Sequence, residues 1–384
     1  MSSNDVAKGK KFRIIKLVLL LVIFSLMAFV IVSVIIGFTT GSSWLFNLFT
    51  PPAPEISVDE FSFDIGRLRT FASANNSVAA AGTLGIKVLD QDGRESFRDS
   101  FRMNQPAIAG SNNRYIAFDI GGTAARVFNN SQVTSSIEAN GAIVSASINQ
   151  NGWFCIVTQE GGGFRGVVTV YNSSGSVVYR VRKGSGFILS AHLSHDNKSL
   201  AVLNLTENGS RITFYNDINV EEEPSQLFDY GGLILEITYL TNGDILAISM
   251  KSLFLVDSSG TGEMLYSFAD KRLGGYTYDN DLIALRLYYY GVGHQGQLIT
   301  FLPDGTILGD IEFDREIISM STADSMLVIL KNDGVTFYDH ELEALSASVD
   351  GLSAAGANRV LAINANVAVA TSDNSAIVIR VNNE

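Results

Sequence analysis

The residues with the clearest binding chemistry lie in one tyrosine-rich segment, Tyr288-Tyr289-Tyr290-Gly-Val-Gly-His294. An exposed tyrosine joins a flat apolar ring to a polar hydroxyl, which suits it to contact a sugar face or a partner chain. We therefore predict a ligand-facing set that consists of Tyr288, Tyr289, Tyr290 and His294. The structural alternative is that alternate tyrosines pack between sheets while the glycine-rich turn carries His294 into solvent. No catalytic, cofactor-binding or metal-ligating residue is predicted.

Two histidines, His192 and His195, and the acid that follows them, Asp196, raise the question of a metal site. Residues three apart in a strand point to opposite faces, so the two imidazoles diverge unless a turn intervenes. No third ligand follows at a spacing typical of zinc sites. Asp90-Gln-Asp-Gly93 and Asp333-Gly334 resemble parts of calcium loops, but they lack the further acids of an oxygen cage. We interpret the histidines as structural or surface residues and the two acidic segments as hairpin turns.

The segment Asp119-Ile-Gly-Gly-Thr-Ala-Ala-Arg126 resembles the first phosphate-binding loop of sugar kinases of the actin-like ATPase superfamily. The resemblance implies that the aspartate and the glycine turn receive nucleotide phosphates. It covers eight residues, and no second phosphate loop or adenosine motif accompanies it. The segment also falls in register with an internal repeat of the chain. We therefore interpret Gly121-Gly122 as the turn of a β-hairpin.

The elements that must position these residues follow from that internal repeat. A short strand with β-branched or aromatic residues at alternate positions, usually closed by Asn or Asp, recurs eight times at intervals of 37 to 45 residues. Its copies are Ile86–Asp90, Ala125–Asn129, Val168–Asn172, Ile212–Asn216, Leu253–Asp257, Leu298–Leu302, Val335–Asp339 and Ile377–Val381. A second apolar strand stands upstream of each copy. Because a four-stranded propeller blade needs roughly 40 to 50 residues, the repeat predicts an all-β, eight-bladed β-propeller, with seven blades as the alternative.

The last repeat predicts how the ring closes. The chain ends three residues after Val381, so the eighth blade lacks an outermost strand. The strand-like segment Ile56–Asp64 stands before the first repeat and has no other place. Supplying the missing strand from the other end of the domain removes an exposed sheet edge. We therefore predict that Ile56–Asp64 pairs with Ile377–Val381.

Residues 17–38 form a stretch of 22 residues without a charge. At about 1.5 Å rise per residue, a helix of that length crosses a bilayer core. Five basic residues and one acid precede it, which by the positive-inside rule keeps the N-terminus in the cytoplasm. The alternative, a cleaved secretory signal, has a shorter apolar region that ends in small residues. The expected organisation is a cytoplasmic basic tail (1–16), a transmembrane helix (17–38), a Pro-containing juxtamembrane linker (39–55) and an extracytoplasmic β-propeller (56–384).

The charge balance of the exported part excludes a nucleic-acid partner. The chain has 27 Lys and Arg and 39 Asp and Glu residues, of which five and one precede residue 39, so the remainder carries a net charge of −16. Phosphates repel such a surface. The single cysteine, Cys155, excludes an intramolecular disulfide, and its apolar neighbours predict a small buried residue. No Gly-x-Ser-x-Gly elbow points to a hydrolase.

The layout of basic tail, single helix, proline spacer and blade-like repeats is similar to an uncharacterised family of single-pass, membrane-anchored β-propeller proteins with WD-like repeats from Firmicutes. The resemblance covers nearly the whole chain and implies an envelope location. We predict a membrane-anchored, extracytoplasmic binding or scaffolding propeller that acts without catalysis on envelope proteins or wall glycans. The alternative is an envelope enzyme that acts on a glycan or uses a bound quinone. An enzyme should gather several buried acids or a cofactor on the propeller axis, whereas a binder should expose an apolar or aromatic patch on one rim.

Overall fold

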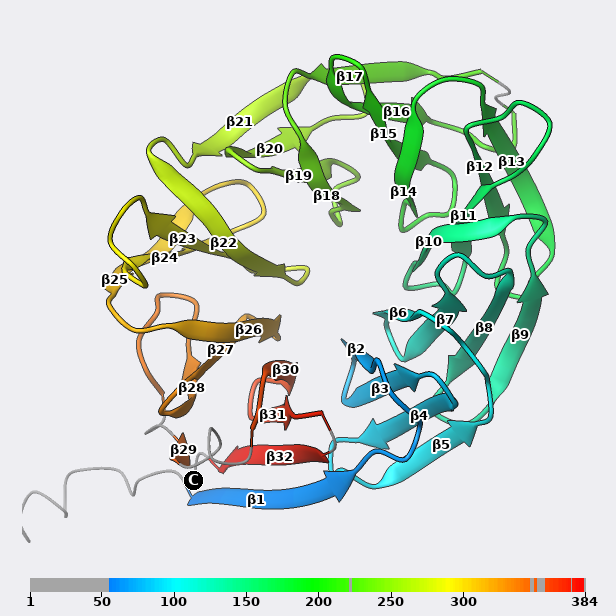
Figure 1. Ribbon diagram of the computed structural model, residues 1–384. Coiled ribbons are helices and arrows are strands. Elements are labelled where there is room, and N and C mark those ends of the chain that lie inside the picture. Colours follow the sequence, from blue (N-terminus) through cyan, green and yellow to red (C-terminus); the bar gives the residue numbers. More distant parts are fainter. Residues whose placement is uncertain (1–54, 221–222, 346–348, 351–355, 374, 383–384) are drawn as a thin grey trace, which may run out of the picture. The chain divides into compact units, whose positions relative to one another are not determined.

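Thirty-two strands make up the regular structure of the described residues, and they assemble into eight four-stranded sheets. The computed structural model describes residues 55–384 with the exception of 221–222, 346–348, 351–355, 374 and 383–384. Figure 1 shows the sheets arranged around a central opening like the blades of a propeller. Ile56–Asn383 form one compact unit. The predicted fold, an eight-bladed β-propeller, is confirmed.

Each blade is numbered in chain order, and its strands are called A to D from the innermost to the outermost. Blade 1 consists of β2 (Thr70–Ala74), β3 (Ser77–Gly82), β4 (Gly85–Asp90) and β5 (Glu95–Asp99). Blade 2 consists of β6 (Pro106–Ser111), β7 (Arg114–Asp119), β8 (Ala124–Asn129) and β9 (Val133–Glu138). Blade 3 consists of β10 (Ala142–Ile148), β11 (Phe154–Gln159), β12 (Gly166–Tyr171) and β13 (Val177–Lys183). Blade 4 consists of β14 (Phe187–Leu193), β15 (Leu200–Thr206), β16 (Gly209–Tyr215) and β17 (Gln226–Tyr230).

The second half of the ring repeats this arrangement. Blade 5 consists of β18 (Ile234–Tyr239), β19 (Ile245–Ser249), β20 (Ser252–Val256) and β21 (Gly262–Ser267). Blade 6 consists of β22 (Lys271–Tyr278), β23 (Ile283–Tyr289), β24 (Gly296–Phe301) and β25 (Ile307–Phe313). Blade 7 consists of β26 (Ile317–Ala323), β27 (Met326–Lys331), β28 (Gly334–Tyr338) and β29 (Val349–Asp350). Blade 8 consists of β30 (Arg359–Asn364), β31 (Val367–Thr371), β32 (Ser375–Asn382) and β1 (Glu55–Ser62).

Blade 8 joins the two ends of the propeller. Its strand order is β1-β32-β31-β30, so the first strand of the domain is hydrogen-bonded to the last. Figure 1 shows β1 lying outside β32 at the edge of the ring. The predicted pairing of Ile56–Asp64 with Ile377–Val381 is thereby confirmed, and each of the eight predicted repeat strands is strand C of its blade.

Strand B of each blade is mostly apolar because both of its faces are covered. In β11, Phe154 and Ile156 pack toward blade 2, whereas Cys155 and Val157 pack toward blade 4. Successive side chains of a strand point to opposite faces, so a strand between two neighbouring blades shows a continuous apolar run rather than alternation. Cys155 is fully buried, as predicted, and burial raises the pKa of its thiol.

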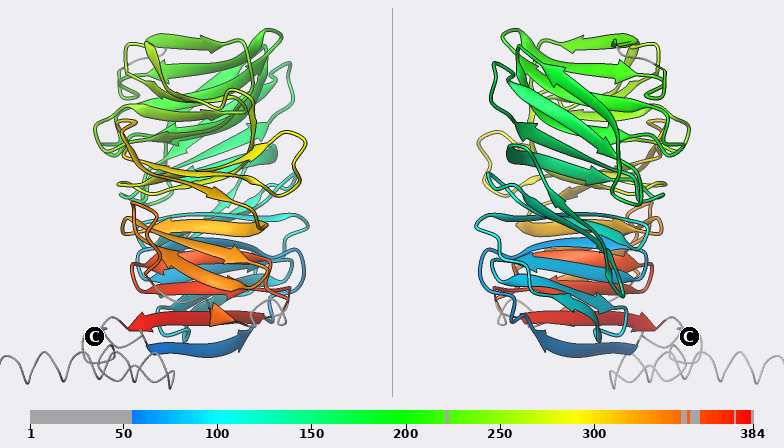
Figure 2. Two further views of the ribbon diagram at one scale, coloured as in Figure 1. Left: turned by 90° about the vertical axis from the view of Figure 1, so that its left-hand side faces the viewer. Right: turned by 90° about the vertical axis from the view of Figure 1, so that its right-hand side faces the viewer.

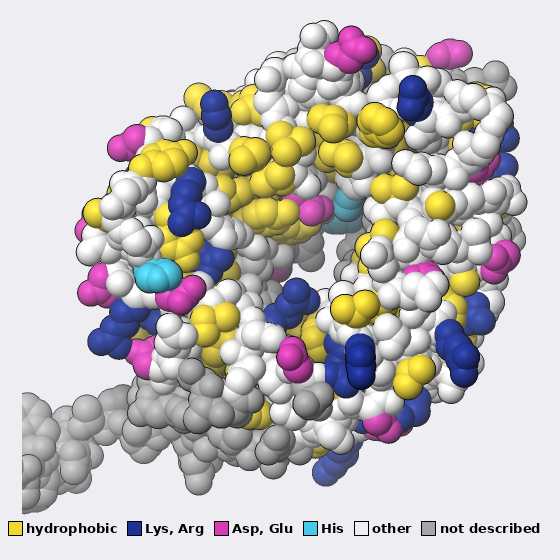
Figure 3. Space-filling view, viewed as in Figure 1, with side chains coloured by type: hydrophobic (Ala, Val, Ile, Leu, Met, Phe, Trp, Pro, Cys, Tyr) yellow, Lys and Arg dark blue, Asp and Glu magenta, His cyan; other side chains and the backbone are white. Residues whose placement is uncertain are grey.

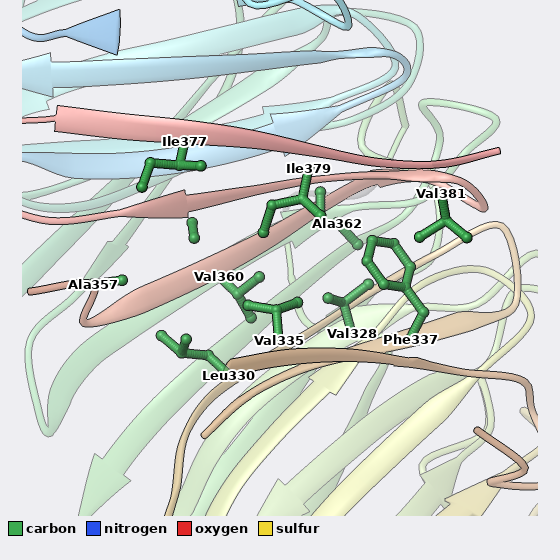
Figure 4. Close-up of a cluster of buried hydrophobic side chains, with 12 residues drawn as sticks. Val328, Leu330, Val335, Phe337, Ala357, Val360, Ala362, Ile377, Ile379 and Val381 are labelled. Atoms are coloured by element: carbon green, nitrogen blue, oxygen red, sulfur yellow. The ribbon is translucent and has the colours of Figure 1, made fainter. Parts of the chain in front are cut away.

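One apolar cluster lies at each of the eight interfaces between neighbouring blades of the described structure. Figure 4 shows the cluster between blades 7 and 8, where Phe337 from β28 lies beside Val381 from β32. Burial of a side chain of this size contributes about 1.5–3 kcal/mol. The core is therefore a ring of eight similar clusters, and no blade buries its faces without its neighbours.

Hydroxyl side chains connect the innermost strands of neighbouring blades. Each strand A is a sheet edge, with backbone groups that its own blade leaves unpaired. Ser145 and Ser147 of β10 donate to the carbonyl oxygens of Leu189 and Ala191 in β14, at 2.9 and 2.6 Å. Small residues at these positions also leave space where eight blades converge. These serines line the central opening, and their hydrogen bonds connect the strands that form its wall.

Asn or Asp at the end of strand C fixes the hairpin that follows. The Oδ1 atom of Asp257 accepts hydrogen bonds from the backbone N–H groups of Ser259 and Thr261, at 2.9 and 3.0 Å. Asp90 makes the same bonds to Asp92 and Arg94. Such Asx turns offer the backbone a local partner where the strand ends. The interpretation of Asp90–Gly93 as a hairpin turn is confirmed.

The propeller has two faces, because neighbouring strands of a blade run in opposite directions. The hairpins between strands B and C lie on one face, together with the connections that lead from one blade to the next. We call this the B–C face, and the opposite one, which carries the hairpins between strands A and B, the A–B face. Figure 2 shows the strands running across the ring between the two faces.

The predicted tail, transmembrane helix and most of the linker, residues 1–54, lie outside the described residues. Within the described part of the chain, no helix has the length and apolar character needed to cross a membrane.

Candidate functional site

Exposed apolar side chains gather on the B–C face over blades 3 to 5. Phe164 lies in the B–C hairpin of blade 3, Phe187 and Leu235 stand at the starts of β14 and β18, and Met250 lies in the B–C hairpin of blade 5. We call these four residues the apolar rim. Figure 3, which views the B–C face, shows apolar side chains concentrated over β14 to β22. We predicted from the sequence that a binding propeller would expose an apolar or aromatic patch on one rim, and the apolar rim is a patch of this kind.

Two arginines accompany the aromatic side chains of the apolar rim. The guanidinium of Arg165 lies 5.6 Å from the ring centre of Phe187, and that of Arg182 lies 5.8 Å from the ring centre of Phe164. Such cation–π pairs are worth about 0.5–1 kcal/mol at exposed sites. Arginine and aromatic residues are also the types that dominate the energetics of protein interfaces. The rim therefore has the composition of a protein-binding surface.

The first residue of the predicted ligand-facing set is largely covered. Tyr288, in β23, is 8% exposed. Its ring packs edge-to-face against Phe313 with the centroids 5.6 Å apart, and the guanidinium of Arg272 lies 4.7 Å from the ring centre. Tyr288 is thus packed against other strands of its own blade, blade 6.

The other three residues of the set lie at the surface of blade 6 but make separate contacts. The hydroxyl of Tyr289 donates to Glu312 Oε1 at 3.0 Å. Tyr290 is 66% exposed. His294, in the same B–C hairpin, has its Nδ1 atom 4.0 Å from Glu316 Oε1. The structure brings Tyr290 and His294 to one exposed hairpin, and their role toward a ligand stays a prediction.

The phosphate-loop resemblance at Asp119–Arg126 has a structural explanation. Asp119 ends β7, and its Oδ1 atom accepts hydrogen bonds from the backbone N–H groups of Asn104 and Gln105, at 2.8 and 2.7 Å. Gly121 follows with φ +80°, a conformation that favours glycine. The carboxylate therefore ties the B–C hairpin of blade 2 to the connection from blade 1, and the hairpin interpretation is confirmed.

A second candidate site lies inside the central opening. A cavity of about 460 Å³ is lined by strand A residues and A–B turns of blades 2 to 6. This volume falls within the range of roughly 300–1,000 Å³ that is typical of small-ligand sites. Figure 3 shows an acidic and a histidine side chain on the wall of the opening, where β14 and β18 lie. The lining includes Glu236, His192 and Tyr278.

Glu236 is the chemically unusual group of this cavity. Its Oε2 atom accepts from the hydroxyl of Tyr276 and its Oε1 atom from the hydroxyl of Tyr278, both at 3.4 Å. The Nε2 atom of His192 lies 3.9 Å from Oε1. Burial raises the pKa of the Glu236 carboxyl to about 7, and the two tyrosine hydroxyls only partly oppose that shift. Glu236 therefore titrates near neutral pH.

The two histidines that the sequence drew attention to both line this cavity. His192 stands in β14, and a turn at Ser194–Asn197 brings His195 to the same cavity. Because this turn intervenes, the two imidazoles do not diverge as they would within one strand. Burial lowers the pKa of His192 to about 4, so its imidazole is neutral at pH 7. No group of three or more His, Cys, Asp or Glu side chains among the described residues is placed to hold a metal ion.

Sequence reasoning did not find Glu236 as a candidate residue. One signal was available, since Glu236 is the single charged residue of the run Ile234-Leu-Glu-Ile-Thr-Tyr239, an innermost strand that is otherwise without charge. Its contacts with Tyr276 and His192 come from two other blades. No spacing within the chain predicts contacts between strands that are brought together only by ring closure.

Comparison with solved structures agrees with the propeller fold. BamB from Moraxella catarrhalis is 13% identical, with 85% of this chain and 100% of that chain covered and a TM-score of 0.51. The WD40 domain of SCAP from fission yeast is 12% identical, with 85% and 98% covered and a TM-score of 0.55. Sqt1 from Saccharomyces cerevisiae is 13% identical, with 84% and 98% covered and a TM-score of 0.57. At these identities the likeness concerns the fold alone.

Comparison with family models gives a match over most of the propeller. A model described as a family of unknown function (DUF5711) matches residues 61–343, which extend from the end of β1 to the hairpin that follows β28. No curated protein matches the chain in sequence.

Proposed function

We propose that this chain, which belongs to the family of unknown function DUF5711, is a binding or scaffolding propeller that presents its apolar rim to a protein of the cell envelope. The observation that carries the proposal is the concentration of exposed apolar side chains, accompanied by Arg165 and Arg182, on one face of the ring. Isolated apolar residues are normal on protein surfaces, but a gathered patch marks an interaction site.

A protein partner fits the composition of the rim better than a wall glycan does. The flexible apolar side chains Leu235 and Met250 adapt to an irregular apolar partner, and the aromatic–arginine pairs supply the groups that anchor protein interfaces. The propeller frame holds these groups on short hairpins and connections, where binding residues are often found.

The proposed location is the outer side of the cell membrane, with residues 17–38 as a single-pass anchor and the N-terminus in the cytoplasm. The support comes from the uncharged length of that segment and the basic residues before it. The alternative function, an envelope enzyme that acts on a glycan or with a quinone, has weaker support. Its expected signature was several buried acids on the axis, and the cavity lining includes only two among the described residues, Glu236 and Asp279.

Two methionines of blade 5 provide a matched test. Met250 in the apolar rim and Met264 on the outermost strand are each 55% exposed. We expect M250E to abolish crosslinking of the full-length protein in its native membrane to a defined envelope protein, because a charge in the apolar rim must be desolvated on binding. M264E should retain that crosslink.

Comparison of the M250E and M264E variants with the wild type also distinguishes the binding function from the enzyme alternative. If M250E and M264E give the same crosslinked proteins as the wild type, the rim is not the binding surface. If the purified propeller turns over a wall glycan or reduces a quinone, and that activity is lost in E236Q and kept in M250E, the enzyme alternative replaces the proposal.

A further inference from the structure

The cavity on the propeller axis offers a carboxylate without a positive partner. About 30% of the Glu236 side chain is open to solvent, and the carboxylate belongs to the lining of the cavity. Among the described residues that line the cavity there is no lysine or arginine. The neighbouring imidazole of His192 is neutral at pH 7, because burial lowers its pKa to about 4. An ionised Glu236 therefore faces the cavity without a counter-charge from the protein.

The contacts that Glu236 does make leave it under-satisfied. A carboxylate has about four lone-pair sites, and the two tyrosine hydroxyls reach it only at 3.4 Å, beyond the usual range for such bonds. Burial without a full set of partners disfavours the charged form. A ligand that brings positive charge and hydrogen-bond donors would relieve both deficits.

The rest of the wall also presents acceptors to the cavity. Ser145 and Ser147 line the cavity, and each hydroxyl donates its hydrogen bond to a carbonyl oxygen of β14. A hydroxyl whose proton is committed retains only acceptor capacity toward a ligand. Tyr278, whose hydroxyl reaches the carboxylate, also lines the cavity. The Glu236 carboxylate and the acceptor sites of these two serines suit the donors of an ammonium or guanidinium group.

We propose that this cavity binds an ammonium or guanidinium group, with Glu236 as its counter-charge and Tyr278 in the cavity wall beside that carboxylate. A bare metal ion does not fit, because calcium takes 6–8 oxygen ligands and no group of three or more His, Cys, Asp or Glu side chains in the described structure is placed to hold one. The site is lined by strands A and by A–B turns, whereas the apolar rim lies on the B–C face. The proposal therefore goes beyond the proposed function and does not depend on it.

Two sources could supply such a group, a small free amine or a basic side chain of a protein. Isothermal titration of the full-length protein in detergent distinguishes them. The free probes are agmatine and putrescine, and the peptide probes are acetyl-Gly-Arg-Gly-amide and acetyl-Gly-Lys-Gly-amide. The corresponding citrulline and norleucine peptides have nearly the same shape without the charge. We expect at least one charged probe to bind at pH 8, and its neutral counterpart to bind at least tenfold more weakly or not at all.

Variants of blade 5 test the role of Glu236. E236Q keeps the shape of the side chain and removes its charge, so we expect it to weaken binding of the charged probe at least tenfold. The control E263Q removes an exposed acid from β21 of the same blade, and the rim variant M250E leaves the axis unchanged. Both should bind as the wild type does. Thermal denaturation shows whether E236Q is folded, and the probe should raise the midpoint of the wild type alone.

The pH dependence gives an independent readout. The titratable groups around Glu236 are His192 and His195 from blade 4, and Tyr276, Tyr278 and Asp279 from blade 6. Of these, His192 titrates near pH 4. Probe affinity should therefore fall as the pH is lowered from 8 to 6, where Glu236 takes up its proton.

The proposal is overturned if none of the four charged probes binds at pH 8, if citrulline and norleucine peptides bind as well as arginine and lysine peptides, or if E236Q binds like the wild type. Binding of agmatine or putrescine alone identifies a small amine as the ligand. Preferential binding of the peptides identifies a basic segment of a protein.

Discussion

At the scale of the residue, Glu236 makes the stability of the propeller depend on pH. The pKa of this carboxyl rises from its ordinary value of 4.5 to about 7 on folding, because burial disfavours its charge. Below pH 4.5 the group is protonated in the folded and unfolded states, and no penalty applies. As the pH rises from 4.5 to 7, the unfolded chain gains more from ionisation than the folded chain does, so the free energy of unfolding falls.

We expect E236Q to be insensitive to this effect. Relative to E236Q, the wild type should lose about 1–3 kcal/mol of unfolding free energy between pH 4.5 and 7 and should show little further change above that range. Urea denaturation at several pH values measures the difference. His192 titrates in both proteins, so its contribution largely cancels. A constant difference between wild type and E236Q across that range would contradict the raised pKa, and E263Q controls for the loss of one acid.

Single residues were predictable from the sequence where their environment is local. The burial of Cys155 follows from its apolar neighbours, and the hairpin role of Asp119 follows from the two glycines after it. The contacts of Glu236 were not predictable in the same way. They join blades 4, 5 and 6, and such contacts depend on the curvature of the whole ring.

At the scale of the element, strand C often begins with a glycine where another backbone comes close. A Cβ atom built on Gly85, at the start of β4, would lie 2.5 Å from the carbonyl oxygen of Asp99 in β5. Gly296, at the start of β24, shows the same restriction against the carbonyl oxygen of Leu287 in β23. The closeness of neighbouring strands at the B–C face therefore requires a residue without a side chain.

We expect G85A to destabilise the protein by about 1–3 kcal/mol, because backbone atoms must move to admit the methyl group. The control is G161A, since a Cβ atom on Gly161 would meet no atom within 4 Å and this glycine has no positive φ. Its effect should stay within about 0.5 kcal/mol. Chemical denaturation of both variants measures the difference. Equal stability of the two variants would show that β4 and β5 separate without cost.

The strands themselves were predictable because their pattern is local and repeated. Strand C can be recognised by β-branched or aromatic residues at alternate positions and by a closing Asn or Asp that makes an Asx turn, as at Asp257. Strand B can be recognised by a continuous apolar run, because both of its faces are covered. The apolar rim was less accessible, because Phe164 and Met250 stand in hairpins where sequence alone does not distinguish an exposed apolar side chain from a buried one.

At the scale of the whole molecule, the stability of the ring depends most on blade 8, which is built from both ends of the domain. Seven blades are continuous in sequence, and the loss of one contact within them leaves the chain connection intact. In blade 8, no hairpin joins β1 to β32, and the two strands are paired by hydrogen bonds. Each blade also shares its apolar cluster with the next. Opening the ring at blade 8 therefore exposes an edge and weakens both of its interfaces.

This closure predicts different outcomes for two truncations. Removal of residues 1–54 leaves β1 in place, so the propeller should keep its thermal midpoint. Removal of residues 1–62 also takes β1 and leaves β32 as a bare edge, which is a template for pairing with other chains. We expect the longer truncation to lower the midpoint by at least about 5 °C and to promote association. Thermal denaturation and light scattering of the two purified proteins measure these effects. If both proteins melt alike and remain monomeric, β1 is dispensable, and blade 8 is stabilised by its interfaces with blades 7 and 1 rather than by its fourth strand.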